Sequence, residues 1–430
     1  MKRTTIFLAS LGFALFGNAA QADNVLYEYG GWLIRDGKSG HVAKFQAGLS
    51  EALAACDSST RLTPDGLFGN GTRKAIVEVA ACETVSLQLE ADSPARTGAI
   101  TNTLWQAILP GTPTPSVSQR AASLKLTFEA TDYDRMQWNF CQNTPLYRPD
   151  QGQNECHSND KRSYITWGPN GATAGWGREV QAILNRYLEG DGNAAQFDNA
   201  FGDEASAVRR MLTLEDSQNG SLETYLCGVW MDKSRRDNWQ AGFRTLGRSA
   251  DIRAAYRDIY GSASFDAGKI AAFYKIWQSE DVALPVTEID HAFFTDRAAH
   301  MGMGRSTRQK VRDALTELKQ ASGENWPVSP AEVRRHIAKR VLPGNVKIQR
   351  DRLGRDTAFF VEAVGVDNLS ELEMDAWGAR GRRNVIHIGM SDARTMPDFV
   401  PNPALSHPAP TGTITEAERA LCPAVVLNPE

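Results

Sequence analysis

A single glutamate stands at the end of an apolar helical pattern in the first third of the chain. Val117, Ala121, Leu124 and Phe128 recur at helical spacing, and Glu129 follows where that helix is expected to end. The negative pole of a helix dipole and apolar neighbours both favour the protonated form of a carboxyl group. A general acid for glycosidic cleavage needs this property, although a solvated glutamate at a helix end explains the residue equally well.

The elements that follow are expected to hold Glu129 beside a small sheet. A short polar gap leads to an aromatic strand pattern over residues 133–140, and a glycine-rich turn then carries Thr173. An amphipathic helix begins near Glu179, with Val180, Ile183, Leu184, Tyr187 and Leu188 on its apolar face. The helix dipole alone favours an acid in that first turn, so Glu179 is both a structural and a catalytic candidate.

These motifs resemble the lysozyme-like superfamily, and its chitosanase branch in particular. Chitosanases carry L-x-x-x-F-E, whose glutamate is the acid, then an aromatic strand, then D-G-R-G-Y-T-A-G, whose aspartate is the base and whose threonine helps to hold the attacking water. Here residues 124–129 read LKLTFE and residues 171–175 read GATAG. The resemblance implies a lysozyme-like α+β domain with a small β-hairpin region, in which Glu129 is the acid and Thr173 holds water.

The second catalytic group is left open by the sequence. If Thr173 takes the place of the family threonine, Gly168 occupies the aspartate position. A different alignment uses residues 160–166, DKRSYIT, and places Asp160 there, but it requires one inserted residue and a looped-out segment closed by a disulfide. Three alternatives remain: Asp160, Glu179, or a water held by Thr173 with no carboxylate base.

Several side chains near this region are of types that bind sugars. Aspartates can bind sugar hydroxyls or an amino group, and tryptophan faces suit stacking on sugar rings, although turn-forming aspartates and core tryptophans are common. We expect one of the three tryptophans, and not all, to line a groove. The candidates for substrate binding are Asp132, Tyr133, Trp138, Trp167 and Trp176.

A second set of motifs lies between residues 41 and 110. Residues 45–49 read FQAGL, residues 65–72 read DGLFGNGT, and residues 101–108 read TNTLWQAI. They resemble the three-helix peptidoglycan-binding domain of bacterial cell-wall enzymes, with its L-Q-x-x-L, D-G-x-F-G-x-x-T and T-x-x-x-W-x-x-L motifs. The chain departs from this pattern at Phe45, where leucine is usual. A helical spacer with similar turn chemistry is the alternative.

The first 22 residues have the pattern of a cleavable signal peptide. Lys2 and Arg3 precede an apolar run over residues 5–16, and the small-residue triplet AQA follows at residues 20–22. The run is too short for a bilayer span, which takes ~20 apolar residues, and no later segment is apolar for long enough. We therefore expect a periplasmic or secreted protein with no membrane span.

Six cysteines fit an exported chain, because disulfides form in oxidising compartments. Six cysteines allow fifteen connectivities. Proximity in the sequence favours Cys56–Cys82 and Cys141–Cys156, which leaves Cys227 with Cys422. The sequence has no C-x-x-C, so a zinc ribbon or a thioredoxin-type site is not expected.

The rest of the chain is mostly helical up to Asn345, where the helical signal fades. Residues 296–302, DRAAHMG, resemble a late-helix phrase of chitosanase-like domains that packs behind the active site, so His300 is expected in the core. The patterns together predict a mainly α fold. Its expected parts are a signal peptide (1–22), a peptidoglycan-binding-like domain (23–110), a linker (111–120), a lysozyme/chitosanase-like domain (121–345) and a C-terminal extension (346–430) that packs on it or is partly coil.

The net charge and the absence of several motifs exclude some classes of function. Removing residues 1–22 removes two positive charges and takes the formal net charge from −4 to −6, so no nucleic-acid partner is expected. The sequence lacks G-x-S-x-G, H-E-x-x-H and a strand followed by G-x-G-x-x-G, and we expect no cofactor and no metal. We predict an exported glycoside hydrolase acting on peptidoglycan or a chitosan-like amino-sugar polymer. The alternative is a non-catalytic, peptidoglycan-binding envelope protein with a degenerate hydrolase fold.

Overall fold

The computed structural model describes residues 23–85, 87–144, 147–158, 162–175, 177–216, 220–380, 384–405 and 410–429. Helices hold 56% of the residues and strands 7%, which confirms the predicted mainly α class. The predicted signal peptide lies outside the described residues, as do Asp160 and Trp176. A search of the described helices finds none that is long and apolar enough to cross a membrane.

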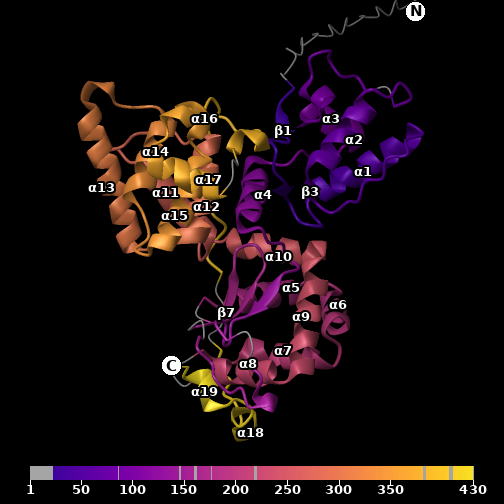
Figure 1. Cartoon of the computed structure of the whole chain (residues 1–430), viewed down its shortest axis with the longest axis vertical. Helices are drawn as coiled ribbons and strands as arrows, with labels where there is room; N and C mark the ends of the chain where they lie inside the picture. Colours follow the sequence, from indigo (N-terminus) through magenta and orange to yellow (C-terminus); the bar gives the residue numbers. More distant parts are fainter. Residues whose placement is uncertain are drawn as a thin grey trace, which may run out of the picture.

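The N-terminal unit, residues 23–110, has its described helices packed beside two short antiparallel ladders, β1 with β4 and β2 with β3 (Figure 1). Phe45 and Trp105 stack with ring centroids 5.7 Å apart in its fully buried core. Its elements are β1 (Val25–Tyr27), β2 (Ile34–Arg35), α1 (His41–Ala55), β3 (Leu67–Phe68), α2 (Asn70–Ala80), the 3-10 helix η1 (Pro94–Thr97), β4 (Ile100–Thr101) and α3 (Asn102–Ile108).

One buried side chain, Gln46, fixes the turn between α1 and α2. Its Nε2 donates to Asp65 Oδ1 and the Leu67 carbonyl, both at 3.1 Å, and to Thr72 Oγ1 at 3.0 Å. Its Oε1 accepts the backbone N–H of Gly66 at 2.9 Å. Because a buried amide is costly unless its hydrogen bonds are made, this pattern ties the F-Q-A-G-L segment to the D-G-L-F-G-N-G-T turn.

Helix α4 (Val117–Glu129) lies between the N-terminal unit and the two other lobes of the molecule (Figure 1). Ser116 and Gln119 form a capping box at its start. The predicted linker, residues 111–120, is therefore partly wrong, because the chain is already helical from Val117. The strong N-cap at Ser116 and the buried contacts of α4 override the linker-like composition.

The sheet unit, residues 130–260, contains the antiparallel sheet β5–β6–β7 and the helices that cover it. Its three strands agree with the expected small β-hairpin region. Its elements are β5 (Met136–Trp138), η2 (Pro149–Gln151), β6 (Ser163–Trp167), β7 (Ala172–Gly175), α5 (Glu179–Leu188), α6 (Asn193–Phe201), η3 (Gly202–Glu204), α7 (Ala205–Thr213), α8 (Ser221–Met231), α9 (Lys233–Gly247) and α10 (Ala250–Tyr260).

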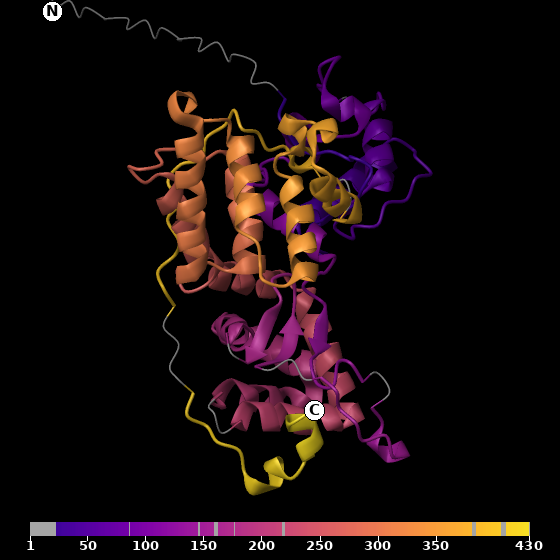
Figure 2. The same cartoon turned by 60° about the vertical axis from the view of Figure 1, so that its left-hand side comes forward.

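The helical unit, residues 261–390, forms the second lobe beside α4 (Figures 1 and 2). It shares one hydrophobic core with the N-terminal unit, to which α4 contributes Ala121, Leu124 and Phe128. Its elements are α11 (Asp266–Trp277), α12 (Glu288–Met301), α13 (Arg305–Ser322), η4 (Gly323–Asn325), α14 (Pro330–Arg340), α15 (Val346–Thr357), α16 (Val361–Val364), η5 (Val366–Asn368), α17 (Glu371–Arg380) and η6 (Val385–Ile388).

The prediction that helices fade after Asn345 is wrong, because α15 begins at the next residue. The reason lies in which side chains α15 buries. Arg352, Arg355 and Asp356 are each at most 2% exposed, so the inward face of this helix is ionic and leaves no apolar period in the sequence. Residues 121–345, predicted as one domain, contribute to two separate hydrophobic cores.

The C-terminal strap, residues 391–405 and 410–429, runs from the helical unit to the sheet unit (Figure 2). Single β-bridges join Thr395 to Thr287, Asn402 to Ser262 and Gly412 to Leu214. Two short helices, α18 (Glu416–Arg419) and α19 (Ala424–Leu427), then pack against α8. The strap therefore links the two lobes.

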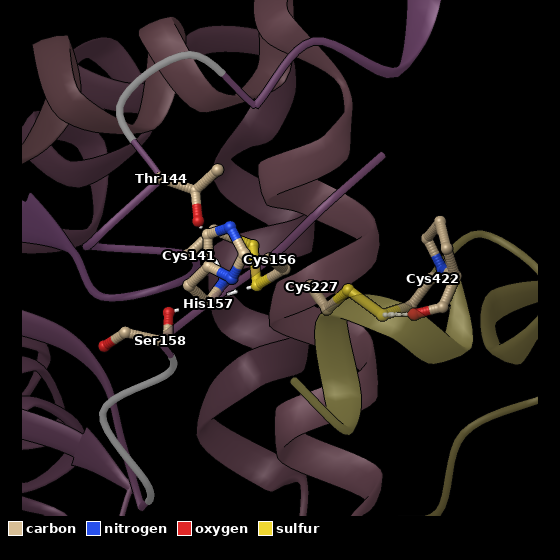
Figure 3. Close-up of a disulfide and its surroundings, with 8 residues drawn as sticks. Cys141, Thr144, Cys156, His157, Ser158, Cys227 and Cys422 are labelled. Atoms are coloured by element: carbon tan, nitrogen blue, oxygen red, sulfur yellow. Dashed lines mark hydrogen bonds between the residues drawn. A yellow bond between two sulfur atoms is a disulfide. The ribbon is translucent and has the colours of Figure 1, made fainter. Parts of the chain in front are cut away.

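The disulfides are Cys56–Cys82, Cys141–Cys156 and Cys227–Cys422, as expected from the sequence. The first joins the ends of α1 and α2. Figure 3 shows the other two, of which Cys141–Cys156 closes the loop between β5 and β6, and Cys227–Cys422 anchors the strap to α8.

Asp36 lies where the N-terminal unit, α4 and α10 meet, and it is 1% exposed. Its Oδ1 accepts from Ser123 Oγ at 2.6 Å and lies 3.0 Å from Arg253 Nη2. Its Oδ2 accepts the backbone N–H of Val42 at 3.0 Å. The carboxylate thus connects α1, α4 and α10. From each of these helices it pairs one polar group, and buried polar groups need such partners.

Candidate active site

Glu129 is the last residue of α4, and Ala130 ends the helix in the left-handed conformation. The glutamate side chain is 32% exposed, and its Oε1 lies 2.6 Å from Arg355 Nη1. The sequence predicts apolar surroundings for this carboxyl group. The structure instead provides a guanidinium from α15, which approaches across the end of α4.

Arg355 belongs to a buried ionic cluster formed by α12 and α15. Its Nη1 lies 3.3 Å from Asp296 Oδ1, and its Nε lies 3.3 Å from Asp351 Oδ2. Arg352 pairs with Asp296 and lies 2.9 Å from Asp356. Burial alone would raise the pKa of Asp296, but Arg352 and Arg355 lower it. The cluster holds Arg355 in place behind Glu129.

A second polar group connects α4 to the turn between β6 and β7. Lys125, one helical turn before Glu129, donates from Nζ to Asn170 Oδ1 at 2.7 Å. Asn170 in turn donates to Asp266 Oδ2 at 2.9 Å, and Asp266 lies 4.0 Å from Lys125. Burial lowers the pKa of the Lys125 ammonium, while Asp266, Asp296 and Glu129 act in the opposite direction. The sheet turn is thereby fixed beside the end of α4.

Thr173 on β7 and Glu179, the first residue of α5, form a hydrogen-bonded pair. Glu179 Oε2 accepts from Thr173 Oγ1 at 2.6 Å and from the Thr173 backbone N–H at 3.1 Å. Both side chains are half-buried. Both donors bond the same carboxylate oxygen, and Oε1 has no hydrogen bond to any residue that the structure describes. The geometry brings together two of the predicted catalytic residues.

Gly168 takes a backbone conformation and a position that leave little room for a side chain. Its φ is +73°, and a Cβ there would lie 2.3 Å from Tyr256 Oη. That hydroxyl is buried and donates to the Trp167 carbonyl at 2.7 Å. An L-residue at position 168 would therefore meet both backbone strain and a fixed phenol.

The phenol of Tyr260 lies near Lys125. Lys125 Nζ is 5.9 Å from the centre of its ring. Burial raises the pKa of Tyr260, with Tyr256, Asp266 and Glu179 adding to the effect.

The predicted sugar-binding residues are mostly structural in position. Tyr133 is buried, with Arg253 4.8 Å from the centre of its ring, and Asp132 accepts the Tyr133 backbone N–H at 2.7 Å. Trp167 is fully buried and donates to the Tyr133 carbonyl at 2.7 Å. Trp138 is 7% exposed and packs on Trp239. Asp132 and Tyr133 lie where the sheet unit meets the N-terminal unit. Trp138 and Trp167 belong to the core of the sheet unit.

Sequence reasoning missed Arg355, Asp296, Lys125, Asn170 and Asp266 as parts of this region. A signal for Arg355 was present, since residues 351–356 read DRLGRD and place two acid–base pairs at a spacing of four. His300 lies 3.2 Å from Asp351 and is 18% exposed in its side chain, which puts it at the edge of the cluster.

Comparisons of the chain with models of protein families, with curated proteins and with solved structures find no match. The region around Glu129 is therefore interpreted from its own geometry and from the motifs in the sequence.

Proposed function

We propose that this protein is an exported glycoside hydrolase that cleaves a β-linked amino-sugar polymer, either peptidoglycan or a chitosan-like glycan. The observations that support the proposal are the ion pair of Glu129 with Arg355 at the exposed end of α4 and the hydrogen bond of Thr173 to Glu179. Two carboxyl groups on either side of a cleavable bond are what glycoside hydrolysis requires.

Glu129 is assigned as the general acid that protonates the glycosidic oxygen. Its carboxylate is paired with Arg355 Nη1 at 2.6 Å. Arg355 has two other partners, Asp296 and Asp351, at 3.3 Å each.

Glu179 is assigned as the group that activates the attacking water, with Thr173 orienting it. This replaces the family's aspartate, whose position is Gly168 in this chain. Carboxyl groups about 6.5–9.5 Å apart leave room for a water and give inversion of the anomeric centre, whereas about 5–5.5 Å gives retention. The assignment of a water-activating base predicts inversion.

The N-terminal unit supports a polymeric substrate. Its Gln46-centred turn has the D-G-x-F-G motif that resembles peptidoglycan-binding domains. The three disulfides are compatible with a protein outside the cytoplasm, and we propose a periplasmic or secreted location on the basis of the N-terminal sequence pattern.

Turnover of purified sacculi and of chitosan by the wild type, Glu129→Gln and Glu179→Gln tests the proposal. We expect each substitution to lower kcat by about 10²-fold or more, whereas Glu324→Gln, an exposed glutamate on η4, should change little. Activity that is unaffected by Glu129→Gln would refute the site.

A second candidate function is a non-catalytic envelope protein that binds peptidoglycan with a degenerate hydrolase fold. The glycine at position 168 favours it. Absence of turnover on either polymer, together with retained binding to sacculi in a pull-down, would establish this alternative instead.

A further inference from the structure

Helix α13 lies at the outer edge of the helical unit (Figure 1). It packs on α11, α14 and η4, and its buried residues are Val311, Ala314 and Leu315, so most of its circumference faces solvent. Its sequence, RSTRQKVRDALTELKQAS, has five basic residues and two acidic ones. Because the whole chain carries a formal net charge of −4, this helix is a positive surface on an acidic protein.

Four of the cations share one face of α13. At 3.6 residues per turn they fall within a sector of about 60°, and at ~1.5 Å per residue they extend over about 21 Å of the helix axis. All four side chains are exposed. We call this row the basic stripe, and it consists of Arg305, Arg308, Arg312 and Lys319.

The two acidic residues of α13 lie outside the basic stripe. Asp313 and Glu317 are about 80° or more from any stripe residue around the helix. Both are engaged elsewhere, since Gln309 Nε2 donates to Asp313 at 2.8 Å and Arg340 of α14 pairs with Glu317. The acids of the helix therefore do not neutralise the stripe.

The basic stripe also lacks counter-charges from other elements. The side chains of its three arginines make no ion pair and no hydrogen bond with any residue that the structure describes. Lys319 donates to the backbone carbonyl of Asp281, which is a neutral acceptor. An anion that approaches the stripe would not have to displace an internal carboxylate.

The stability of α13 does not account for these cations. Arg305 and Arg308 open a helix whose first turn contains no acidic residue, although the positive pole of the helix dipole disfavours cations there. Like charges three and four residues apart, as in Arg305–Arg308 and Arg308–Arg312, also repel each other. A bound anion would relieve both effects.

The geometry of the stripe favours a linear polyanion as its partner. The planar guanidinium of arginine matches carboxylate and phosphate groups, and a straight row of cations suits an extended polymer with repeated negative charges. A lipid surface is disfavoured, because helices that lie on membranes insert an apolar face and α13 has no large hydrophobic side chain among the exposed ones.

We propose that the basic stripe of α13 binds the stem-peptide carboxylates of peptidoglycan. The choice of polymer rests on the proposed function, and the stripe selects peptidoglycan over chitosan, whose ammonium groups it would repel. The helical unit thereby has a contact of its own with the polymer, in addition to that of the N-terminal unit. This binding requires neither Glu129 nor Glu179.

The test is co-sedimentation of the full-length protein with purified sacculi that have been freed of phosphate polymers. The parent protein carries Glu129→Gln, which prevents cleavage of the polymer. Two variants of it each lose three positive charges. The stripe variant adds Arg305→Gln, Arg308→Gln and Arg312→Gln. The control variant adds substitutions of exposed cations on α9, α15 and α18, namely Arg244→Gln, Lys347→Gln and Arg419→Gln.

At about 0.1 M salt, the stripe variant should bind sacculi with a Kd at least about tenfold weaker than that of the parent, and the control variant should differ by less than about twofold. At about 1 M salt, where the Debye length falls from ~10 Å to ~3 Å, the difference should disappear. It should also disappear on sacculi whose carboxylates have been amidated. The stripe variant should melt at the parent's temperature or higher, because repulsion within α13 is removed.

Four outcomes would overturn the proposal: no binding of the parent to sacculi, an unchanged Kd in the folded stripe variant, an equal loss in the control variant, or a loss that persists on amidated sacculi. Stripe-dependent binding to phosphatidylglycerol vesicles that exceeds binding to sacculi would also overturn it, in favour of a membrane. Stripe-dependent binding to sacculi by a protein whose wild type hydrolyses neither polymer would refute the proposed function and leave the stripe assignment standing. Hydrolysis of sacculi with unchanged binding in the stripe variant would do the reverse.

Discussion

The carboxylate of Glu129 lies 2.6 Å from the guanidinium of Arg355, although 226 residues separate them in the chain. The contact joins the end of α4 to α15 and thereby connects the exposed glutamate to the buried cluster of Asp296, Arg352 and Asp356. The environment of Glu129 is therefore set by the helical unit as much as by its own helix.

Replacing Arg355 by methionine should destabilise the protein. The substitution removes a guanidinium that is 3% exposed in its side chain and leaves Asp296 and Glu129 less well paired. We expect a loss of roughly 3 kcal/mol in the free energy of unfolding, measured by urea denaturation. Arg350 on the same helix makes an exposed pair with Asp375, so Arg350→Met should change stability by less than about 0.5 kcal/mol. Equal losses in the two variants would contradict a structural role of the cluster.

Replacing Thr173 by valine should lower kcat and leave KM nearly unchanged. Valine keeps the shape of the side chain but removes the hydroxyl that donates to Glu179 at 2.6 Å. If this pair activates water, the loss should be about 10²-fold, and Thr173→Ser should recover most of it. Steady-state kinetics on sacculi and on chitosan, the two proposed substrates, provides the measurement. A valine variant as active as the wild type would remove Thr173 from the mechanism.

His291 should make the protein less stable in mild acid. Burial lowers the pKa of its imidazole from 6.5 to about 4, between Ser118 Oγ at 2.9 Å and Tyr274 Oη at 3.0 Å. The unfolded chain therefore binds a proton at higher pH than the folded chain. The contribution is fully present above pH 6.5 and is lost as the pH falls towards 4, on the order of 3 kcal/mol in total.

Urea denaturation at several values between pH 7.5 and pH 4.5 measures this effect. The stability of His291→Gln should depend on pH less steeply than that of the wild type. The exposed residue His157 provides the control, since His157→Gln should keep the wild-type slope. Identical slopes in all three proteins would show that His291 does not titrate as proposed.

Removing the Cys227–Cys422 disulfide should cost more stability than removing Cys141–Cys156. The first pair closes 195 residues of chain and the second only 15. In the chain-entropy model the cost rises with the length of the closed loop, from roughly 3 to about 5 kcal/mol. Double alanine variants of each pair, compared by denaturation under non-reducing conditions, test the order. A larger loss from the shorter loop would indicate that local packing, and not loop closure, determines the cost.

Local patterns were sufficient to predict some of this architecture. The apolar spacing before Glu129 predicts α4, the aromatic and glycine-rich segments predict the sheet, and the nearest cysteines predict two of the disulfides. Each of these signals lies within a few dozen residues of chain, where periodicity and turn chemistry act directly.

The partners of Glu129 could not be predicted in the same way. Arg355 lies on a helix whose buried face is ionic, so its sequence resembles an exposed segment. Asp266 and Asn170 are brought together by tertiary packing, 96 residues apart. Tryptophans that suit sugar stacking by type, such as Trp167, pack in the core because their large apolar surface contributes more to folding there.

The position of Asp36 has a consequence for how the N-terminal unit can act. A binding domain on a flexible tether raises the local concentration of its polymer but does not fix its direction. Here Asp36 binds α4 and α10 directly, and the N-terminal unit shares its core with the helical unit. If a polymer contacted both the N-terminal unit and another unit, the two contact sites would thus be held at one distance and one angle to each other. A truncated chain that begins at Gly111 would also expose the apolar face of α4, so the unit acts as a structural part of the scaffold and not as a detachable anchor.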